Sequence, residues 1–319
     1  MEYVAGIFMD DRTRCWICDL NGRVLSRGES GGVRYKREGT AALGDALGDA
    51  FFAAAKALGV KKVRVLSVCI PDVDTASDEL RVRGLLNALD IADDVLIYND
   101  SVAAFIGAIA PEGDSAEGVM VIGDMGAVAF GMTGEGDAAR AGGWEFFLSD
   151  EGSVYWIAKR ALRSVMKSYD GRGDKTSLEM TLIDSFKLND VREFVDLFYA
   201  GKLGQKELIS IFRDTVGEAK KGDEVSIAMV ERAEKELLLH AKAVIERLGL
   251  QDGEFEIATR GMVFDALREL GLYETFQREV REVTGGARFI EPRYEPVYGA
   301  LALALEKETG KFIIPEARR

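Results

Sequence analysis

The stretch GVMVIGDMGAVAFG, residues 118–131, decides how the chain is organised. Two apolar runs in it predict strands, and the acid and glycine between them predict a tight turn. A glycine turn between strands often holds a phosphate, because backbone N–H groups approach closely where no Cβ intervenes. Asp124 lies inside this turn, where an anion is repelled. The residues alone leave open whether the turn binds a phosphate or only reverses a hairpin.

The chain opens with the same arrangement of short strands. Strand-like runs begin at Tyr3 and Arg14, and Asn21-Gly22 ahead of a third run predicts a type I′ hairpin. The segments that follow alternate between helix and strand: a helix over 40–59, a strand over 63–70, a helix over 78–89, a strand over 95–100 and a helix over 101–110. This order predicts a mixed sheet that is covered by helices.

Residue 118 starts a second meander, and α/β elements again follow it. Mostly helical sequence comes first, and the later elements are a strand over 254–259, a helix from 263, a strand ARFI and a helix near 296–308. The repeated order predicts a duplicated α/β fold. We expect an N-terminal domain over 1–112, completed by the helix 296–309, and a C-terminal domain over 113–295 with a helical insertion.

The amino-acid composition limits the classes of binding partner that we expect. The 319 residues are 47% hydrophobic and 30% charged, with a formal net charge of −13. So acidic a surface repels phosphate backbones, which argues against a nucleic acid partner but permits a small anion in a local cradle. No run approaches the roughly 18 apolar residues of a membrane helix, and strand-like alternation at the N-terminus differs from a signal peptide. We therefore expect a cytoplasmic protein without a membrane partner.

The histidine and the cysteines are not expected to be catalytic or metal-binding residues. His240 lies within the helical pattern ELLLHAKAVIERL, so it is expected to be an ordinary helix residue. Cys15 and Cys18 have the spacing of a redox or zinc motif, but strand alternation places them on opposite faces. We expect structural roles for these residues.

A second stretch, ARAGGWEFFLSDEGSVYWIAKRALR at residues 139–163, carries a resemblance. It is similar to the BadF/BadG/BcrA/BcrD-type ATPases and the N-acetylglucosamine kinase-like sugar kinases, including archaeal hexokinases, of the actin/hexokinase/Hsp70 superfamily. That family has a Gly-Gly-Trp and then an Asp-Glu-Gly-Ser that opens a helix, and both are present here. The resemblance covers essentially the whole chain. It implies a duplicated actin-like (RNase H-like) fold with two mixed-sheet domains flanking a cleft.

Asp100 is the candidate catalytic residue. It follows a predicted strand that ends at Asn99, and open α/β sheets bind ligands at the carboxyl ends of their strands. Taken alone, these residues are better explained as helix caps. The resemblance implies that Asp100 takes the proton from a sugar hydroxyl as that hydroxyl attacks the γ-phosphate of ATP.

The first hairpin departs from the family. The family's phosphate loop reads Asp-Gly-Gly-Gly-Thr-Lys-Thr, and here the corresponding residues 7–13 read IFMDDRT. The resemblance implies that Asp11, Arg12 and Thr13 contact the nucleotide, with Arg12-Thr13 in place of Lys-Thr. Asp10, together with Asp124, is the candidate ligand of Mg²⁺, which often uses few protein carboxylates. The alternative is that Asp10 and Asp11 are solvated hairpin residues.

The other two nucleotide turns are altered as well. The family's second phosphate loop, Gly-Thr-Gly-Ser, aligns with Asp124-Met125-Gly126-Ala127, so both hydroxyl donors are replaced and a carboxylate has entered. Where the family has Gly-Gly-Gly for the adenosine, this chain has a threonine followed by Arg260 and Gly261. The guanidinium groups of Arg12 and Arg260 are candidates to compensate, since they suit phosphate oxygens.

The resemblance also supplies the sugar-binding candidates. They are Arg34, Asn99, Gly143, Trp144, Asp150 and Glu151. Arg34 stands where the family has a sugar-contacting asparagine, so a charged substrate is an open alternative.

Hypotheses of two different classes follow. The first is an ATP-dependent sugar kinase acting on a hexose or amino sugar, with Mg²⁺ and, as in many family members, a homodimer. The second is a catalytically inactive protein of the same fold with a regulatory or scaffolding role, since each lost phosphate contact is worth roughly 1.5–3 kcal/mol. An ATPase that activates a dehydratase or reductase is disfavoured, because that class holds an iron–sulfur cluster and the cysteines here lie mostly in strands. We favour the kinase, because Asp100 and the Asp-Glu-Gly-Ser motif are retained.

Overall fold

The computed structural model describes residues 2–110 and 116–316. The chain forms two compact units. Unit 1 comprises the described residues up to Gly118, Met132–Asp137 and the described residues from Glu291 onward. Unit 2 comprises Val119–Gly131 and Ala138–Ile290. The predicted domain boundary at 112/113 lies outside the described residues, and the domain limits stay a prediction.

Unit 1 is built on a mixed five-stranded sheet with the order β3-β2-β1-β4-β5. Its strands are β1 (Tyr3–Met9), β2 (Arg12–Asp19), β3 (Val24–Gly31), β4 (Val63–Ile70) and β5 (Ala92–Asn99). The first three strands are antiparallel neighbours, whereas β1, β4 and β5 run parallel. The carboxyl ends of β1, β4 and β5 therefore meet at one edge of the sheet.

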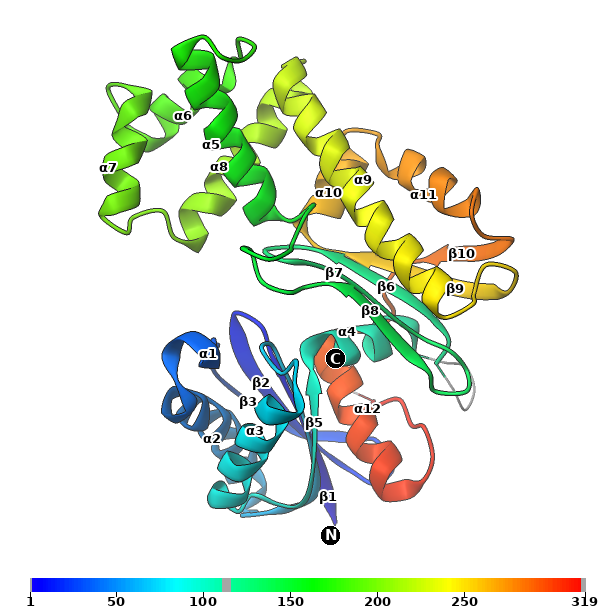
Figure 1. Ribbon diagram of the computed structural model, residues 1–319. Helices are drawn as coiled ribbons and strands as arrows, with labels where there is room; N and C mark the ends of the chain where they lie inside the picture. The colour runs from blue at the N-terminus through cyan, green and yellow to red at the C-terminus, as the bar shows by residue number, and fades with distance from the viewer. Residues whose placement is uncertain (1, 111–115, 317–319) are drawn as a thin grey trace. The chain divides into compact units, whose positions relative to one another are not determined.

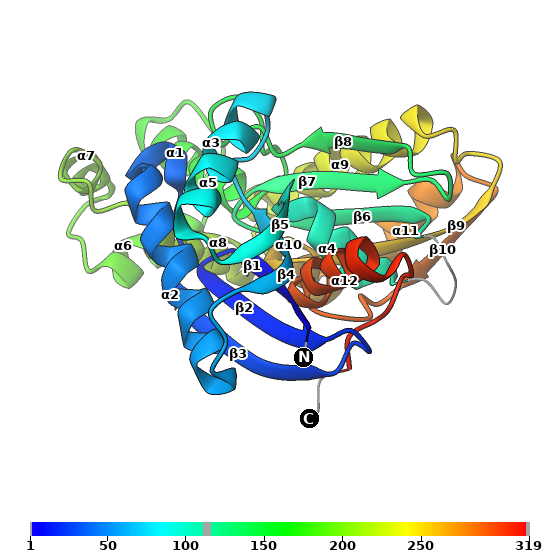
Figure 2. The same ribbon diagram turned by 90° about the horizontal axis from the view of Figure 1, so that it is seen from below.

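Helices cover both faces of this sheet, as Figures 1 and 2 show. They are α1 (Tyr35–Glu38), α2 (Thr40–Leu58), α3 (Ala76–Leu89), α4 (Asp100–Ile109) and α12 (Pro296–Thr309). Alternation along β1 divides the core: Ile7 packs with α2 and α3, and Val4 packs with α12 on the other face. Such alternation is what a strand buried on both sides requires.

Unit 2 repeats the strand order of unit 1. Its sheet runs β10-β9-β6-β7-β8, so in both sheets the first strand of the set lies between the second and the fourth. The strands are β6 (Gly118–Gly123), β7 (Ala127–Met132), β8 (Ala138–Gly142), β9 (Glu254–Arg260) and β10 (Gly286–Ile290). The identical order confirms the duplication that the sequence predicts.

The helices of unit 2 form two groups. Those that share a core with the sheet include α9 (Glu224–Arg247), α10 (Met262–Glu269) and α11 (Tyr273–Arg281). A helical insertion between β8 and β9 has its own core and contains α5 (Val154–Asp170), α6 (Leu178–Phe186), the short 3₁₀ helix η1 (Val191–Glu193), α7 (Phe194–Tyr199) and α8 (Gln205–Lys220). In Figure 1, α6 and α7 lie away from the sheet of the unit, whereas α5 and α8 also contribute residues to the core of the sheet.

One local prediction, the type of the β2–β3 turn, needs correction. The β2–β3 turn is not type I′, because Asn21 does not have the positive φ that this type requires. Instead the Asp19 carboxylate accepts from the backbone N–H groups of Asn21 and Arg23, each at 3.0 Å, and Gly22 alone is left-handed at φ 83°. A Cβ on Gly299 of α12 would lie 2.1 Å from the carbonyl oxygen of Ala103 in α4, so this glycine lets the two helices pack closely.

The cysteines lie as the strand pattern predicts. Cys15 and Cys18 belong to the cores on opposite faces of the unit 1 sheet, and both are buried free thiols. Burial raises the pKa of each thiol, so neither is a reactive thiolate. Within the described ranges, none of the helices is both long enough and apolar enough to span a bilayer.

Candidate functional site

The β1–β2 turn of unit 1 satisfies its own backbone. The carboxylate of Asp10 accepts from the backbone N–H of Arg12 at 3.0 Å, which is the kind of donor a phosphate would otherwise use. Asp10 also forms an ion pair with Arg14, while the Arg12 guanidinium lies 2.7 Å from Glu29. Burial, followed by the neighbouring Asp11, raises the pKa of Asp10. The turn therefore already contains an internal anion.

The residues on either side of this turn are also held by internal hydrogen bonds and close packing. Thr13 is completely buried, and its hydroxyl donates to the carbonyl of Gly31 at 2.8 Å. The N–H of Gly32 donates to the Asp11 carbonyl at 3.1 Å, and a Cβ on Gly32 would lie 2.5 Å from the Asp10 carbonyl oxygen. The predicted nucleotide residues of unit 1 thus lie together, but the Thr13 hydroxyl is used within the sheet.

Asp100 lies at the carboxyl edge of the same sheet. It is the first residue of α4, half-buried, where the positive end of the helix favours a negative charge. Asn99 caps the helix, since its side-chain oxygen accepts from the Ser101 N–H at 3.1 Å and from the Ser101 hydroxyl at 2.7 Å. The Asn99 amide donates to Asp74 at 3.3 Å. The strand-to-helix junction that carries Asp100 is therefore fixed from both sides.

Arg34 has a partner that the sequence analysis missed. Its Nη1 lies 3.7 Å from Oδ1 of Asp72, a buried residue just beyond the end of β4. The available signal was the PDVD segment that follows a buried strand, because such positions line the ligand edge of an α/β sheet. A second pairing lies beside it, in which Asp78 accepts from the Tyr35 hydroxyl at 2.5 Å.

The β6–β7 turn of unit 2 is built differently. The Asp124 N–H donates to the Gly126 carbonyl at 2.9 Å, and the Asp124 carbonyl accepts from Val154 N–H at the start of α5 at 2.8 Å. The Ala127 N–H donates to the carboxylate of Asp150 at 3.3 Å. A Cβ on Gly126 would lie 3.3 Å from that carboxylate, so glycine gives Asp150 room to approach. The carboxylate that accepts from the backbone of this turn therefore comes from a separate loop.

The Asp-Glu-Gly-Ser motif holds Asp150 in this position. Asp150 itself has a left-handed backbone at φ 67°, and Gly152 follows at φ 87°, where a Cβ would lie 2.9 Å from the Ala233 carbonyl oxygen of α9. Ser153 caps α5 by accepting from the Trp156 N–H at 3.1 Å. Burial is the main cause that raises the pKa of Asp150 to about 6. Its charge is thus poorly compensated by the protein.

Arg260 and Gly261 adjoin the same turn. Gly261 precedes α10 with φ 107°, and a Cβ there would lie 2.4 Å from the Gly123 carbonyl oxygen and 3.1 Å from the Asp124 Cβ. Arg260 is half-buried at the end of β9, and no ion pair of its guanidinium is found within the part of the chain that the structure describes. Unit 2 therefore brings together Asp124, Asp150 and an available cation.

The Gly-Gly-Trp segment is held by Arg140. Its guanidinium donates to the carbonyls of Gly142 and Gly143 and lies 4.4 Å from the centre of the Trp144 ring. Trp144 remains half exposed, which leaves an aromatic surface that suits the apolar face of a sugar. His240 in α9 packs against Gly142, and burial lowers the pKa of its imidazole. Glu151, next to Asp150, is half-buried.

The residues present do not form a complete metal site. Among the side chains that the structure describes, no group of three or more His, Cys, Asp or Glu is arranged to hold an ion. A Mg²⁺ ion commonly keeps waters and substrate phosphates with only one or two carboxylates, so it fits this protein only as a companion of a nucleotide. Asp10 and Asp124 stay the predicted protein ligands.

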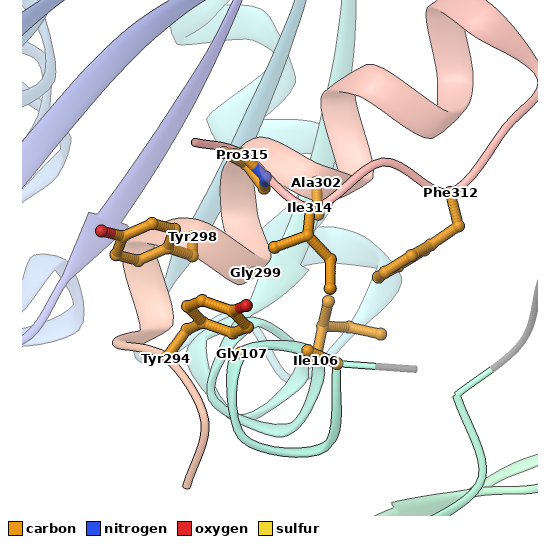
Figure 3. A pocket seen from close by; sticks show the side chains of 10 residues that line it. Ile106, Gly107, Tyr294, Tyr298, Gly299, Ala302, Phe312, Ile314 and Pro315 are labelled. Carbon is orange, nitrogen blue, oxygen red and sulfur yellow. The ribbon is translucent and has the colours of Figure 1, made fainter. Parts of the chain in front are cut away.

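An apolar pocket of unit 1 is separate from these groups. It is a small, open hollow of about 10 Å³. It lies between α4, α12 and the C-terminal segment, as Figure 3 shows. Its lining residues are Ile106, Gly107, Ala110, Tyr294, Tyr298, Gly299, Ala302, Phe312, Ile314 and Pro315. None of these side chains is charged, so the pocket provides no group for a phosphate.

Two α/β units with one shared strand order define the actin-like class of folds, and solved structures confirm it. A structure described as a putative N-acetylglucosamine kinase from Chromobacterium violaceum matches with a TM-score of 0.74 and 20% identity, over 96% of this chain and 99% of that one. A ROK family glucokinase from Streptomyces griseus, in complex with glucose and AMPPNP, matches with a TM-score of 0.55 and 14% identity, over 95% and 99% of the two chains.

Residues 12–304 match the BadF/BadG/BcrA/BcrD ATPase family, and the chain belongs to it. An N-acetylmuramic acid/N-acetylglucosamine kinase of Clostridium acetobutylicum is 30% identical over 77% of this chain and 79% of its own length. An N-acetyl-D-glucosamine kinase of Dictyostelium discoideum is 29% identical, with 78% of both chains covered. The resemblance that the sequence predicts is therefore confirmed.

Proposed function

We propose that the protein is an ATP-dependent sugar kinase, which transfers the γ-phosphate of ATP to a hydroxyl of a hexose or amino sugar. The observation that carries the proposal is the placement of Asp100 at the N-terminus of α4, at the carboxyl edge of the unit 1 sheet. The proposal is supported by the sugar kinases that are 29% and 30% identical to this chain.

In the proposed reaction Asp100 is the general base. Its carboxylate accepts the proton of the substrate hydroxyl as the oxygen attacks the γ-phosphorus, and the β–γ bond breaks to release ADP. Asn99 positions Asp100, because its own side chain is held by Ser101 and Asp74. In unit 2, Trp144, Asp150 and Glu151 are the proposed sugar contacts.

The nucleotide is assigned to unit 2 in this proposal. The Arg260 guanidinium, which precedes Gly261 at the start of α10, supplies a positive charge to the phosphates. Mg²⁺ that arrives with ATP neutralises phosphate charge. ATP and free sugars are abundant in the cytoplasm, where we place the protein, and a homodimer stays a prediction that sedimentation tests.

One observation favours the second candidate, a catalytically inactive protein of the same fold. The Asp10 carboxylate accepts the hydrogen bond of the Arg12 N–H in the β1–β2 turn. Unit 1 therefore has one backbone N–H fewer for binding a phosphate than an open glycine turn. Such a protein is expected to bind ATP no better than about millimolar, or not at all.

The deciding experiment measures ADP release with Mg²⁺-ATP and a panel of neutral and acidic hexoses and amino sugars. The kinase predicts sugar-dependent release and a sugar phosphate as product. Asp100→Asn, which keeps the shape of the side chain, is expected to lower kcat by roughly 10²–10⁴-fold while sugar affinity changes little. Full turnover in Asp100→Asn would remove Asp100 as the base. No turnover and no heat of ATP binding would establish the inactive protein.

A further inference from the structure

Asp72 lies beside the proposed catalytic base at the edge of the unit 1 sheet. In the parallel pair β4–β5, Ile70 stands opposite Asn99, so the residues that follow the two strands share one edge. The amide of Asn99 donates to the carbonyl of Val73, the residue after Asp72, at 3.5 Å. The segment that carries Asp72 therefore contacts the segment that carries Asp100.

The Asp72 carboxylate is buried and incompletely paired. Only 7% of the residue is exposed, and Oδ2 has no hydrogen-bond partner within residues 2–110 and 116–316. The residue is also held rigidly, because its φ is 69° and its carbonyl accepts from the Tyr35 hydroxyl at 3.2 Å. A buried carboxylate oxygen without a donor carries an uncompensated desolvation cost. A ligand hydroxyl or amide N–H that reaches Oδ2 removes that cost.

Arg34 supplies the complementary donors. Its side chain is 52% exposed, and its Nη1 lies 3.7 Å from Asp72 Oδ1, which is an ion pair but too long for a hydrogen bond. No hydrogen bond of the guanidinium to the described residues is found. Its N–H groups therefore remain available to an acceptor on a ligand, next to the unpaired oxygen of Asp72.

The other charged residues near the pair carry an excess of negative charge, because Lys36 faces two aspartates and the Glu38 carboxylate accepts from the Arg34 backbone N–H at 2.9 Å. The nearby cation Lys36 is already engaged by Asp74 at 3.1 Å and by Asp78 at 3.2 Å. Asp72 is therefore the acidic partner of Arg34, and Lys36 is paired with other carboxylates. A substrate carboxylate placed here is attracted by Arg34 and repelled by Asp72 to a similar degree, so its lost hydration is not recovered.

We propose that Arg34 and Asp72 form a donor–acceptor pair that selects an uncharged sugar over one bearing a carboxylate. Asp72 Oδ2 accepts from a hydroxyl or acetamido N–H of the sugar, and Arg34 donates to a neighbouring oxygen of it. The proposal rests on the proposed kinase function. It also separates the two substrates in the name of the Clostridium acetobutylicum relative, N-acetylglucosamine and N-acetylmuramic acid, because only the second carries a carboxylate.

The test compares kcat/KM for these two sugars in four forms of the full chain. The forms are the wild type, Asp72→Asn, the double variant Asp72→Asn/Arg34→Ala, and the matched control Asp90→Asn. Asp90 is also a left-handed aspartate of unit 1, with φ 49°, but it is exposed and pairs with Lys62, so its substitution repeats the change of charge away from the pair.

The wild type is expected to favour N-acetylglucosamine by about 10-fold or more. Asp72→Asn shifts the ratio toward N-acetylmuramic acid by roughly 10–100-fold, because the charge of Arg34 is no longer neutralised, and it raises KM for the neutral sugar. In the double variant, the shift toward N-acetylmuramic acid that Asp72→Asn produces is lost. Asp90→Asn is expected to show the ratio of the wild type. Thermal melts and binding calorimetry on each variant separate misfolding from altered specificity.

An unchanged ratio in a folded, active Asp72→Asn overturns the inference and leaves the kinase standing. A wild type that prefers the acidic sugar overturns it as well. If neither sugar is phosphorylated while another sugar of the panel is, the inference fails and the kinase stands. If no sugar of the panel is phosphorylated and none gives a heat of binding, the proposed function fails, and the inference fails with it.

Discussion

The β1–β2 turn and the β6–β7 turn occupy equivalent places in two sheets of the same strand order. Each contains an acid where the family has a glycine-rich phosphate loop. In unit 1 the anion is local, since Asp10 caps the N–H two residues ahead and pairs with Arg14. In unit 2 the anion is Asp150, which comes from another loop and is buried without a cationic partner strong enough to keep its pKa low.

The two turns therefore differ in how their charged side chains are paired. In the turn of unit 1, Asp10 is paired with Arg14 and the Arg12 guanidinium with Glu29, so an added phosphate must displace existing ion pairs. The turn of unit 2 has Gly126, Gly261 and the available guanidinium of Arg260 around it. We therefore propose unit 2 as the place for a nucleotide, and each variant below changes one turn and leaves the other intact.

The largest effect is expected from Gly261→Ala in unit 2. Its φ of 107° disfavours any side chain, and the added Cβ would lie 2.4 Å from the Gly123 carbonyl oxygen. We expect a loss of about 3 kcal/mol or more in the free energy of unfolding, measured by urea denaturation. Gly249→Ala, at φ 66° with nothing within 4 Å, is the matched control and should lose only about 1–2 kcal/mol. Equal losses in both variants would show that Gly261 is not tightly packed.

Asp150→Asn should stabilise the protein, but only at neutral pH. The folded-state pKa of about 6 exceeds the usual value of 3.8, so the stability that this group contributes is present below pH 4 and lost as the pH rises through 6. The asparagine resembles the protonated acid, and the gain at pH 7.5 should approach roughly 2–3 kcal/mol. Thermal melts at pH 7.5 and pH 4 check this, and a gain of equal size at both values would contradict it. Sugar affinity is expected to fall in the same variant.

Asp10→Asn in unit 1 should have the smallest effect. The amide oxygen still accepts from the Arg12 N–H, and the partly exposed ion pair with Arg14 that is lost is worth about 1 kcal/mol or less. Removal of a charge whose pKa is raised by burial offsets part of that loss, so the free energy of unfolding should change by less than about 1 kcal/mol. The contribution of the ion pair should disappear in about 1 M salt, because salt screens the pair. ATP affinity is expected to stay within twofold. A tenfold fall in ATP affinity would assign a phosphate or its Mg²⁺ to unit 1.

The sequence predicted the duplicated fold well because alternation and turn residues are local signals. It failed at the β2–β3 turn, where the Asp19 carboxylate, rather than the Asn-Gly pair, fixes the backbone. The unaided sequence also could not reveal the pairing of Arg34 with Asp72, which depends on the β4–β5 register and on the left-handed backbone of Asp72. Likewise, the DEGS motif pointed to Asp150, but only the fold shows its carboxylate against the Ala127 N–H.

The central claim is that unit 2, through Arg260, carries the nucleotide. Calorimetric titration of Mg²⁺-ATP into Arg260→Ala and Arg12→Ala tests it most directly, because both substitutions remove one guanidinium beside an altered phosphate turn. We predict that Arg260→Ala weakens ATP binding by about 10–100-fold, while Arg12→Ala, whose guanidinium is paired with Glu29, changes it less than threefold. A loss of ATP affinity in Arg12→Ala alone, with Arg260→Ala unchanged, would contradict the account.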